Sequence, residues 1–288
     1  MSSKYGILAY PAGHSLSPAV HNAAFKAAGV DAEYEVCDVK PEDLEVFMNE
    51  MKGGAYDGLS VSSPHKEAVI DFMDNISPDA YDIRAVNTVV LKKGKLIGSN
   101  TDWVGALEAL KRSGVESLVG KKVVILGAGG AARAIAYGLL KERAHVVVLN
   151  RTMDKAQKLA NDLSGLFKGN ASGSLRFGAI EGIGNFEPDI LIQATSIWTT
   201  SGTEAQILPS GYLTGLAREG VRPLVMDIVY KPRITPLLFA AEDADCDVIT
   251  GDKMLLYQAV AQFETWTGKK ATKKVVEAME VALKEGLK

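Results

Sequence analysis

The chain has 288 residues, of which 47% are hydrophobic and 23% are charged, and its formal net charge is −3 at pH 7. This length predicts two domains, and the composition is typical of a soluble globular protein. The small negative charge excludes the broad basic surface that binds nucleic acids or anionic membranes, so we expect neither as a partner.

The chain contains two cysteines, Cys37 and Cys246. They are far apart and have no CxxC or His/Cys spacing, so the sequence predicts neither a disulfide framework nor a zinc site. No apolar run approaches the roughly 18 residues of a membrane-spanning helix, and residues 1–8 lack the apolar core of a signal peptide. We therefore expect a cytoplasmic protein without a bound metal ion.

The first hundred residues alternate between strand-like and helix-like segments, which predicts an α/β domain with its own sheet. The expected elements are a strand at 5–10, a helix at 19–28, a strand at 33–39, a helix at 41–52, a strand at 58–62, a helical segment at 71–75, and strands at 85–91 and 96–99 joined by a hairpin turn. A helix at 104–112 follows. Several of these elements end in polar residues.

Two serines stand near the start of the first expected helix. Ser17 directly precedes Pro18, a pairing typical of a helix N-cap and first turn, so Ser17 is interpreted as a cap. Alternatively, Ser15 and Ser17 hold a carboxylate with their hydroxyls and the free N–H groups of the helix start. The residues alone leave both interpretations open.

Polar residues also crowd beyond the strand at 58–62, where open α/β sheets present ligand-binding groups. Lys66 follows a turn fixed by Pro64 and is a candidate proton donor. The alternative is that Lys66 is a solvated surface charge, as single lysines commonly are.

Asn87 lies within the expected strand at 85–91, and Asp102 follows the expected strand at 96–99. Asn87 stands among apolar residues, so it is either a structural amide with its hydrogen bonds satisfied or a group that binds hydroxyls. Asp102 either caps the helix at 104–112, or it accepts from a substrate hydroxyl or pairs with Lys66.

A buried central strand is predicted at 123–126, because this run is entirely apolar and contains β-branched residues. Small residues follow at Gly127, Gly129 and Ala132, which is the spacing of the strand-to-helix turn that binds dinucleotides. The alanine-rich helix after the turn would present free N–H groups to a pyrophosphate. The alternative is an ordinary tight turn.

The next expected strand, at 145–149, ends in a cation. NAD-specific sites usually carry Asp or Glu about 20 residues past the first glycine, and this chain has no carboxylate there. Arg151, with Lys155 one helical turn further on, suits a 2′-phosphate instead. The sequence therefore predicts NADP(H) rather than NAD(H).

The rest of the chain predicts a Rossmann-like domain and a return of the chain to the first domain. The expected elements are a helix at 153–163, strands at 175–179, 190–194, 224–229 and 248–250, a helix after residue 236, and helices at 253–266 and 272–283. We expect a substrate domain at 1–103, completed by helices in 253–288, and an NADP-binding domain at 104–252.

Ordered motifs along nearly the whole chain resemble those of the shikimate dehydrogenases. They are HSLSP at 14–18, SVSSPHKE at 60–67, AVNT at 85–88, NTDWVG at 100–105, GAGGAARA at 127–134, NRT at 150–152, DIVYKPRITPLL at 227–238 and MLLYQA at 254–259. So many motifs in one order are far more specific than any single motif.

The resemblance implies an enzyme that reduces 3-dehydroshikimate to shikimate with NADPH, a step toward chorismate and the aromatic amino acids. It implies that the catalytic pair is Lys66 and Asp102. It implies that the substrate is held by Ser15, Ser17, Ser62, Asn87, Asp102 and Gln258. It implies that NADP is held by Gly127, Ala128, Gly129, Gly130, Ala131, Asn150, Arg151, Thr152, Lys155, Thr195 and Gly251. Whether the enzyme is a homodimer stays open.

The chain departs from the family pattern at three positions. Ser60 stands where many relatives have Asn, and the segment 193–198 resembles the family's N-A-T-S-x-G with Gln193 for Asn and Trp198 for Gly. A glycine there would let the backbone approach the nicotinamide, which Trp198 alters. Two alternatives therefore stay open: a dehydrogenase of quinate or another shikimate analogue, and a binding sensor that has lost turnover.

Overall fold

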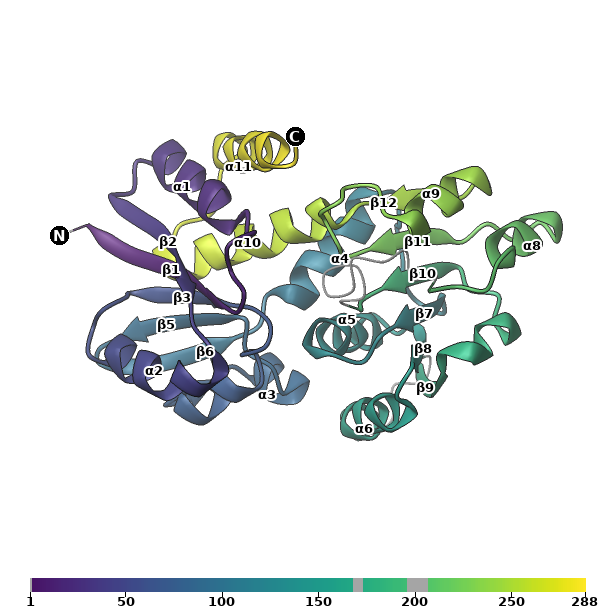
Figure 1. The fold of residues 1–288 in the computed structure, drawn as a ribbon, viewed down its shortest axis with the longest axis horizontal. Helices are drawn as coiled ribbons and strands as arrows, with labels where there is room; N and C mark the ends of the chain where they lie inside the picture. The colour runs from purple at the N-terminus through teal and green to yellow at the C-terminus, as the bar shows by residue number, and fades with distance from the viewer. Residues whose placement is uncertain (1, 168–172, 196–206) are drawn as a thin grey trace. The chain divides into compact units, whose positions relative to one another are not determined.

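The computed structural model describes residues 2–167, 173–195 and 207–288. The chain divides into two compact units, drawn with their element labels in Figure 1. Unit 1 comprises Met1–Gly105 and Leu256–Lys288, and unit 2 comprises Ala106–Leu255. The boundaries expected after residues 103 and 252 differ slightly from these, because both observed boundaries fall inside helices, where the sequence has no break.

Unit 1 is built on a mixed six-stranded sheet in the order β2-β1-β3-β5-β6-β4. Its strands are β1 (Ser3–Ala9), β2 (Ala32–Asp38), β3 (Gly58–Val61), β4 (Asn75–Ile76), β5 (Thr88–Lys92) and β6 (Lys95–Ser99). β1 pairs in parallel with β2 and β3, whereas β5 runs antiparallel to β3 and β6. The carboxyl end of β3 and the start of β5 therefore meet at one edge of the sheet.

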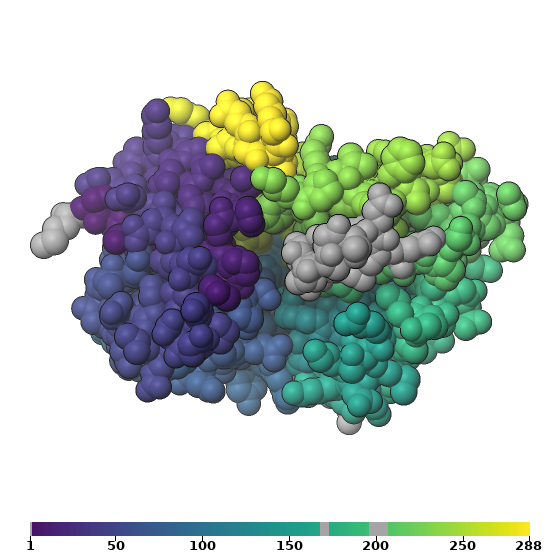
Figure 2. Space-filling model, viewed as in Figure 1, coloured from purple at the N-terminus to yellow at the C-terminus, as the bar shows by residue number. Residues whose placement is uncertain are grey.

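Helices from both ends of the chain cover this sheet. They are α1 (Ser17–Ala28), α2 (Leu44–Lys52), α3 (Pro78–Ile83), α11 (Lys273–Gly286), the part of α10 (Gly251–Thr267) that belongs to unit 1, and the 3₁₀ turns η1 (Pro41–Asp43) and η2 (Ala68–Phe72). Figures 1 and 2 show the yellow C-terminal helix α11 beside the purple N-terminal helix α1, and the two pack together. Val275, Met279 and Leu283 are the buried residues of α11.

The helical segment predicted at 71–75 is wrong. A 3₁₀ turn ends at Phe72, and the chain then forms the short strand β4, which pairs with β6. Asp74 determines this change: its N–H donates to the Leu96 carbonyl at 2.9 Å, and its carboxylate accepts from the Leu96 N–H at 2.8 Å. These long-range hydrogen bonds override the local helical preference.

Unit 2 is built on an all-parallel six-stranded sheet in the order β12-β11-β10-β7-β8-β9. Its strands are β7 (Lys122–Leu126), β8 (His145–Asn150), β9 (Ser174–Ala179), β10 (Ile190–Gln193), β11 (Leu224–Asp227) and β12 (Val248–Ile249). Its helices are the unit 2 part of α4 (Asp102–Arg112), α5 (Gly130–Lys141), α6 (Met153–Ser164), α8 (Tyr212–Arg218) and α9 (Pro236–Asp243), with the 3₁₀ turn η3 (Ile180–Asn185). The two sheets confirm the predicted fold class.

The order of strands in unit 2 reverses between β7 and β10. From β7 the chain proceeds to β8 and β9 on one side, then returns to place β10, β11 and β12 on the other. In open α/β sheets, ligands bind beyond the carboxyl ends of the strands at such a reversal. The turn at Gly127 lies at this position.

The part of the chain that the structure describes has no helix with both the length and the apolar character needed to cross a bilayer. Nor does it bring three or more His, Cys, Asp or Glu side chains into an arrangement that could hold a metal ion. Cys37 and Cys246 are both buried and free.

Candidate active site

Lys66 and Asp102 form an ion pair in unit 1. Lys66 Nζ lies 2.6 Å from Asp102 Oδ2, and the two side chains are 18% and 7% exposed. Lys66 is held in the turn after β3, where its carbonyl accepts from the N–H of Val86 at 2.8 Å. Both side chains are largely buried, and Lys66 is the more exposed of the two.

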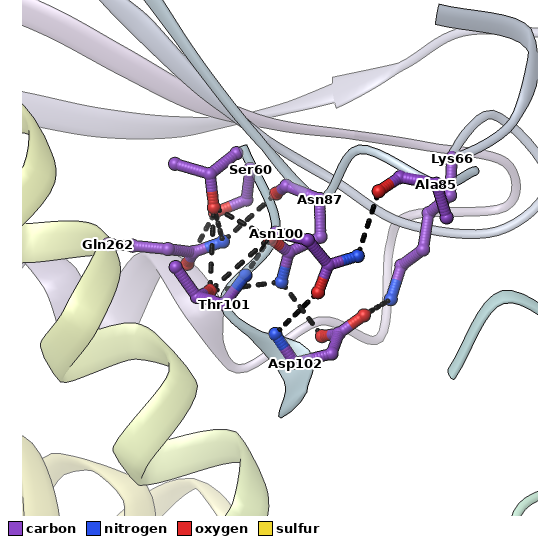
Figure 3. A network of polar contacts seen from close by, with 9 residues as sticks. Ser60, Lys66, Ala85, Asn87, Asn100, Thr101, Asp102 and Gln262 are labelled. Atoms are coloured by element: carbon purple, nitrogen blue, oxygen red, sulfur yellow. Dashed lines mark hydrogen bonds and ion pairs between the residues drawn. The ribbon is translucent and has the colours of Figure 1, made fainter. Parts of the chain in front are cut away.

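Asp102 does not cap a helix that begins at residue 104, because α4 begins at Asp102 itself. Its carboxylate interacts with two side chains: Oδ2 forms the ion pair with Lys66, and Oδ1 accepts a hydrogen bond from Asn87 Nδ2 at 2.8 Å (Figure 3). Its N–H donates to Asn100 Oδ1 at 2.9 Å. Of the interpretations that the sequence leaves open, the structure shows the pairing of Asp102 with Lys66, and a contact with a substrate hydroxyl stays a prediction.

Asn87 is a buried amide whose hydrogen bonds are satisfied within the protein. Its Oδ1 accepts from the N–H of Thr101 and from Thr88 Oγ1, each at 2.7 Å. Its Nδ2 donates to Thr101 Oγ1 at 3.0 Å as well as to Asp102. These bonds fix the carboxylate of Asp102, so the structural interpretation of Asn87 holds, and a contact with a substrate hydroxyl stays a prediction.

The serines of the HSLSP motif lie together at the start of α1. Ser17 is the first residue of the helix, its N-cap is Leu16, and the Ser17 N–H donates to Ser15 Oγ at 3.2 Å. The interpretation of Ser17 as the cap is therefore wrong, because the helix begins earlier than the apolar pattern indicates. Ser17 is buried.

The two remaining residues predicted to bind substrate also belong to unit 1. Ser62 follows β3 and is half-buried, and its N–H donates to the carbonyl of Leu8 at 2.9 Å. Gln258 is buried on α10. Ser62 and Lys66 thus leave the same strand end, whereas Gln258 comes from the other end of the chain.

Sequence reasoning missed Gln262, a buried residue one helical turn after Gln258 on α10. Its Nε2 donates to the carbonyl of Asn87 at 3.0 Å and to Thr88 Oγ1 at 3.2 Å, and its Oε1 accepts from Ser60 Oγ at 2.9 Å. Two glutamines at positions i and i+4 of an apolar helix lie on the same face, so the spacing of Gln258 and Gln262 could have indicated that both belong to one polar site. The hydroxyl of Ser60, which also accepts from Tyr34 at 2.7 Å, is thus engaged inside the protein.

His21 is a buried histidine next to this network. Its ring stacks on Tyr34 with 4.6 Å between centroids, and its Nε2 contacts Gln262 Oε1 at 3.3 Å. Burial lowers the pKa of His21 from 6.5 to about 3, and the hydrogen bond to Gln262 opposes that shift. Between these two pH values the unfolded chain binds a proton that the folded chain does not, so stability falls as the pH drops below 6.5.

We expect this one proton to contribute a slope of up to about 1.4 kcal/mol per pH unit to the free energy of unfolding. Urea unfolding at a series of pH values below 6.5 should therefore show a shallower slope for His21→Phe than for the parent. His145→Gln, which removes an exposed histidine, is the control and should keep the parental slope. Equal slopes for His21→Phe and the parent would contradict this assignment.

In unit 2, the turn between β7 and α5 requires glycine at its first position. Gly127 has φ of +117°, and a Cβ added there would lie 2.8 Å from the carbonyl oxygen of Ala194. A side chain would therefore be strained and would collide with the end of β10. Gly129 is exposed, and a Cβ added there would meet no protein atom within 4 Å.

The start of α5 and the end of β8 form neighbouring parts of one edge of the sheet. Residues Gly130 and Ala131 open α5, so their N–H groups have no partner inside the helix and concentrate positive charge there. β7 and β8 are adjacent, with Leu126 opposite Leu149. The exposed residues Arg151, Thr152 and Lys155 follow the end of β8, and Asn150 Nδ2 donates to the carbonyl of Thr152 at 2.8 Å.

Two further predicted cofactor residues follow β10 and begin α10. Thr195 is fixed by Gln193, whose Nε2 donates to the Thr195 carbonyl at 3.2 Å and whose Oε1 accepts from the Thr195 N–H. Gln193 thus contributes two hydrogen bonds that hold the backbone of this turn. Trp198 lies outside the described residues. At Gly251, an added Cβ would lie 2.5 Å from the carbonyl oxygens of Ile228 and Val229, so the chain packs too closely there for any side chain.

Comparison with known protein families gives matches along the chain. The model of the shikimate dehydrogenase substrate binding domain matches residues 7–89, and that of shikimate / quinate 5-dehydrogenase matches residues 109–233. The model of the shikimate 5'-dehydrogenase C-terminal domain matches residues 253–278. The first and third matches lie in unit 1 and in the segment that returns to it.

Individual proteins match over almost the full length. The shikimate dehydrogenase (NADP(+)) of Thermococcus kodakarensis is 43% identical over 274 residues, covering 92% of this chain and 90% of that protein. The shikimate 5-dehydrogenase of Thermus thermophilus, solved with NADP(H) and shikimate, is 33% identical with a TM-score of 0.83, covering 99% and 100% of the two chains. The 5-ketofructose reductase of Gluconobacter sp. strain CHM43 is 35% identical with a TM-score of 0.81, covering 99% of each chain.

Proposed function

This chain belongs to the shikimate dehydrogenase family, and we propose that Lys66 and Asp102 are the residues that assist its reaction with proton transfer. Its activity is that of an NADP-dependent shikimate dehydrogenase of the shikimate pathway, which interconverts 3-dehydroshikimate and shikimate. The observation that carries the proposal is the ion pair of 2.6 Å between Lys66 and Asp102.

The chemistry of carbonyl reduction explains why such a pair is needed. NADPH supplies the hydride, and its arrival at the ketone carbon leaves negative charge on the oxygen. An ammonium beside that oxygen stabilises the charge and donates the proton that completes the hydroxyl. Asp102 holds the Lys66 ammonium in place, as the third member of a triad orients its base. In shikimate oxidation, the same groups act in the opposite order.

The substrate contacts proposed in unit 1 follow from hydroxyl and amide chemistry. Ser15 and Ser17 would hold the carboxylate of the substrate at the start of α1, where the helix dipole favours an anion. Ser62, Asn87 and Gln258 would bind ring hydroxyls. Support for these roles comes from the motifs that carry them and from their common location in the unit that contains Lys66.

NADP(H) is the cofactor, and the residues proposed to hold it lie in unit 2. Gly127, Ala128, Gly129, Gly130 and Ala131 would surround the pyrophosphate, because N–H groups and the positive end of α5 meet there. The 2′-phosphate would bind to Arg151, with Asn150, Thr152 and Lys155 beside it. Thr195 and Gly251 would approach the nicotinamide half of the cofactor.

The substrate of this chain is tested by steady-state kinetics. We expect kcat/KM, followed by NADPH absorbance, to be highest for shikimate with NADP and lower for quinate and for NAD. 5-Ketofructose with NADPH belongs in the same series, because the matching Gluconobacter protein is a reductase of that compound and Ser60 replaces the asparagine expected from the motif. A higher value for quinate or 5-ketofructose would favour the analogue dehydrogenase, and binding without turnover would favour the sensor.

The compartment is a separate proposal. We infer a reducing one such as the cytoplasm, since Cys37 and Cys246 are both free thiols. Thiol titration of the protein purified without reductant, in the presence of denaturant, should find both thiols reactive. Loss of both thiols under these conditions would argue against this proposal.

A further inference from the structure

We propose that Gln262 is a positioning residue for the Lys66–Asp102 pair. It hydrogen-bonds to Asn87 (Figure 3) and to Thr88, and these two residues connect it to Asp102. This inference rests on the proposed roles of Lys66 and Asp102, and it extends them to a residue that lies in the interior of unit 1.

The amide of Gln262 has a single orientation that suits its neighbours. Its Nε2 lies 3.0 Å from the carbonyl oxygen of Asn87, which can only accept, so the NH₂ end faces β5. Its Oε1 therefore faces the hydroxyl of Ser60 at 2.9 Å and His21 Nε2 at 3.3 Å. Tyr34 donates to Ser60, which leaves the Ser60 proton for Gln262.

From Gln262, a chain of hydrogen bonds runs through Thr88 and Asn87, each donating to the next residue, and ends at the carboxylate of Asp102. Gln262 Nε2 donates to Thr88 Oγ1, so the single hydroxyl proton of Thr88 points to Asn87 Oδ1, 2.7 Å away. With its oxygen engaged there, Asn87 turns its NH₂ group to Asp102 Oδ1 at 2.8 Å. The other oxygen of Asp102, Oδ2, is thereby left for Lys66.

Loss of the Gln262 amide would loosen this arrangement without abolishing it. Gln262, Asn87 and Thr88 are all buried, so water does not readily replace a missing donor. The Thr88 hydroxyl would be free to turn to Thr101 Oγ1, which lies 3.4 Å away. Asn87 would keep the N–H of Thr101 as a donor, so we expect a partial loss of catalysis.

Two variants test the proposal. Gln262→Met keeps the length of the side chain and removes its amide, and Thr88→Val keeps the branched shape and removes the hydroxyl. Each should lower kcat on the order of tenfold, because small displacements of catalytic groups have effects of this size or larger, and leave KM for NADP unchanged. The double variant should lose little more than either single variant, because both act through Asn87.

Trp266→Phe is the matched control for loss of packing. Trp266 lies one turn further along α10 and donates from Nε1 to the carbonyl of Val89 on β5 at 3.1 Å. Its loss should lower Tm and leave kcat of the folded enzyme unchanged, with the folded fraction taken from circular dichroism. If Gln262→Met does not fold, Thr88→Val carries the test.

The proposal is overturned if the folded Gln262→Met and Thr88→Val enzymes both keep kcat within about twofold of the parent. It is equally overturned if Trp266→Phe lowers kcat as much as they do. Lys66→Ala, measured alongside, separates this failure from that of the proposed function. If Lys66→Ala also keeps its kcat, the catalytic pair itself is wrong.

Discussion

Replacing Lys66 with alanine is expected to lower kcat roughly 10²- to 10⁴-fold, the usual contribution of general acid–base catalysis. The alanine cannot donate the proton or stabilise the charge that grows on the carbonyl oxygen. KM for NADP should stay near its parental value, since the residues proposed to bind the cofactor belong to unit 2. Steady-state kinetics with shikimate and NADP, at saturating levels of both, measures this effect.

Two comparisons make the Lys66 result specific. Lys52 also forms an ion pair, 3.0 Å from Asp74, and its side chain is exposed. Lys52→Ala therefore removes the same charge and should leave kcat unchanged.

Lys66→Ala leaves the buried Asp102 carboxylate without its cation, which destabilises unit 1. The double variant Lys66→Met, Asp102→Asn removes both charges, so it should recover Tm but not kcat. An unchanged kcat in Lys66→Ala would remove this residue from the mechanism.

Replacing Arg151 with alanine is expected to raise KM for NADP about 10- to 100-fold, the equivalent of a lost hydrogen-bonded contact to a charged group. KM for NAD should change little, because NAD lacks the 2′-phosphate. Arg151 is exposed at the end of β8, so its loss leaves no unsatisfied group in the core. The measurement is the ratio of the two KM values in the parent and the variant.

Lys158→Ala is the matched control for Arg151. Lys158 is exposed on α6 about one turn beyond Lys155, and its loss removes the same charge from the same region without a proposed contact. It should leave both KM values near those of the parent. If Arg151→Ala raised KM equally for NADP and NAD, the assignment to the 2′-phosphate would be defeated.

The sequence predicts most of the strands and helices, because their signals are local. The apolar run at 123–126 and the Gly-rich turn after it each specify their structure within a few residues. Short elements are different. The strand β4 depends on Asp74 and the distant Leu96, and no periodic pattern of neighbouring residues indicates such a contact.

In the candidate site, too, the sequence predicts residues that stand in short motifs and misses a residue that reaches the site only through long-range contacts. Lys66, Asn87 and Asp102 each stand in a short motif, so the resemblance to the family predicts a role for each of them. Gln262 could not be connected to them, since 175 positions separate it from Asn87 and 202 from Ser60. Only the folded chain brings its amide to β5.

Unit 1 is assembled from both ends of the chain, and this has a consequence for biosynthesis. Phe25 packs near Phe263, and Tyr5 stacks on Trp266 with 5.0 Å between their ring centroids. A ribosome releases Phe263 and Trp266 only after all of unit 2 has been synthesised. Unit 2 is contiguous and has all its residues available sooner. The usual order, in which the N-terminal domain folds first, should therefore be reversed, and unit 1 should complete its packing only after α10 has left the ribosome.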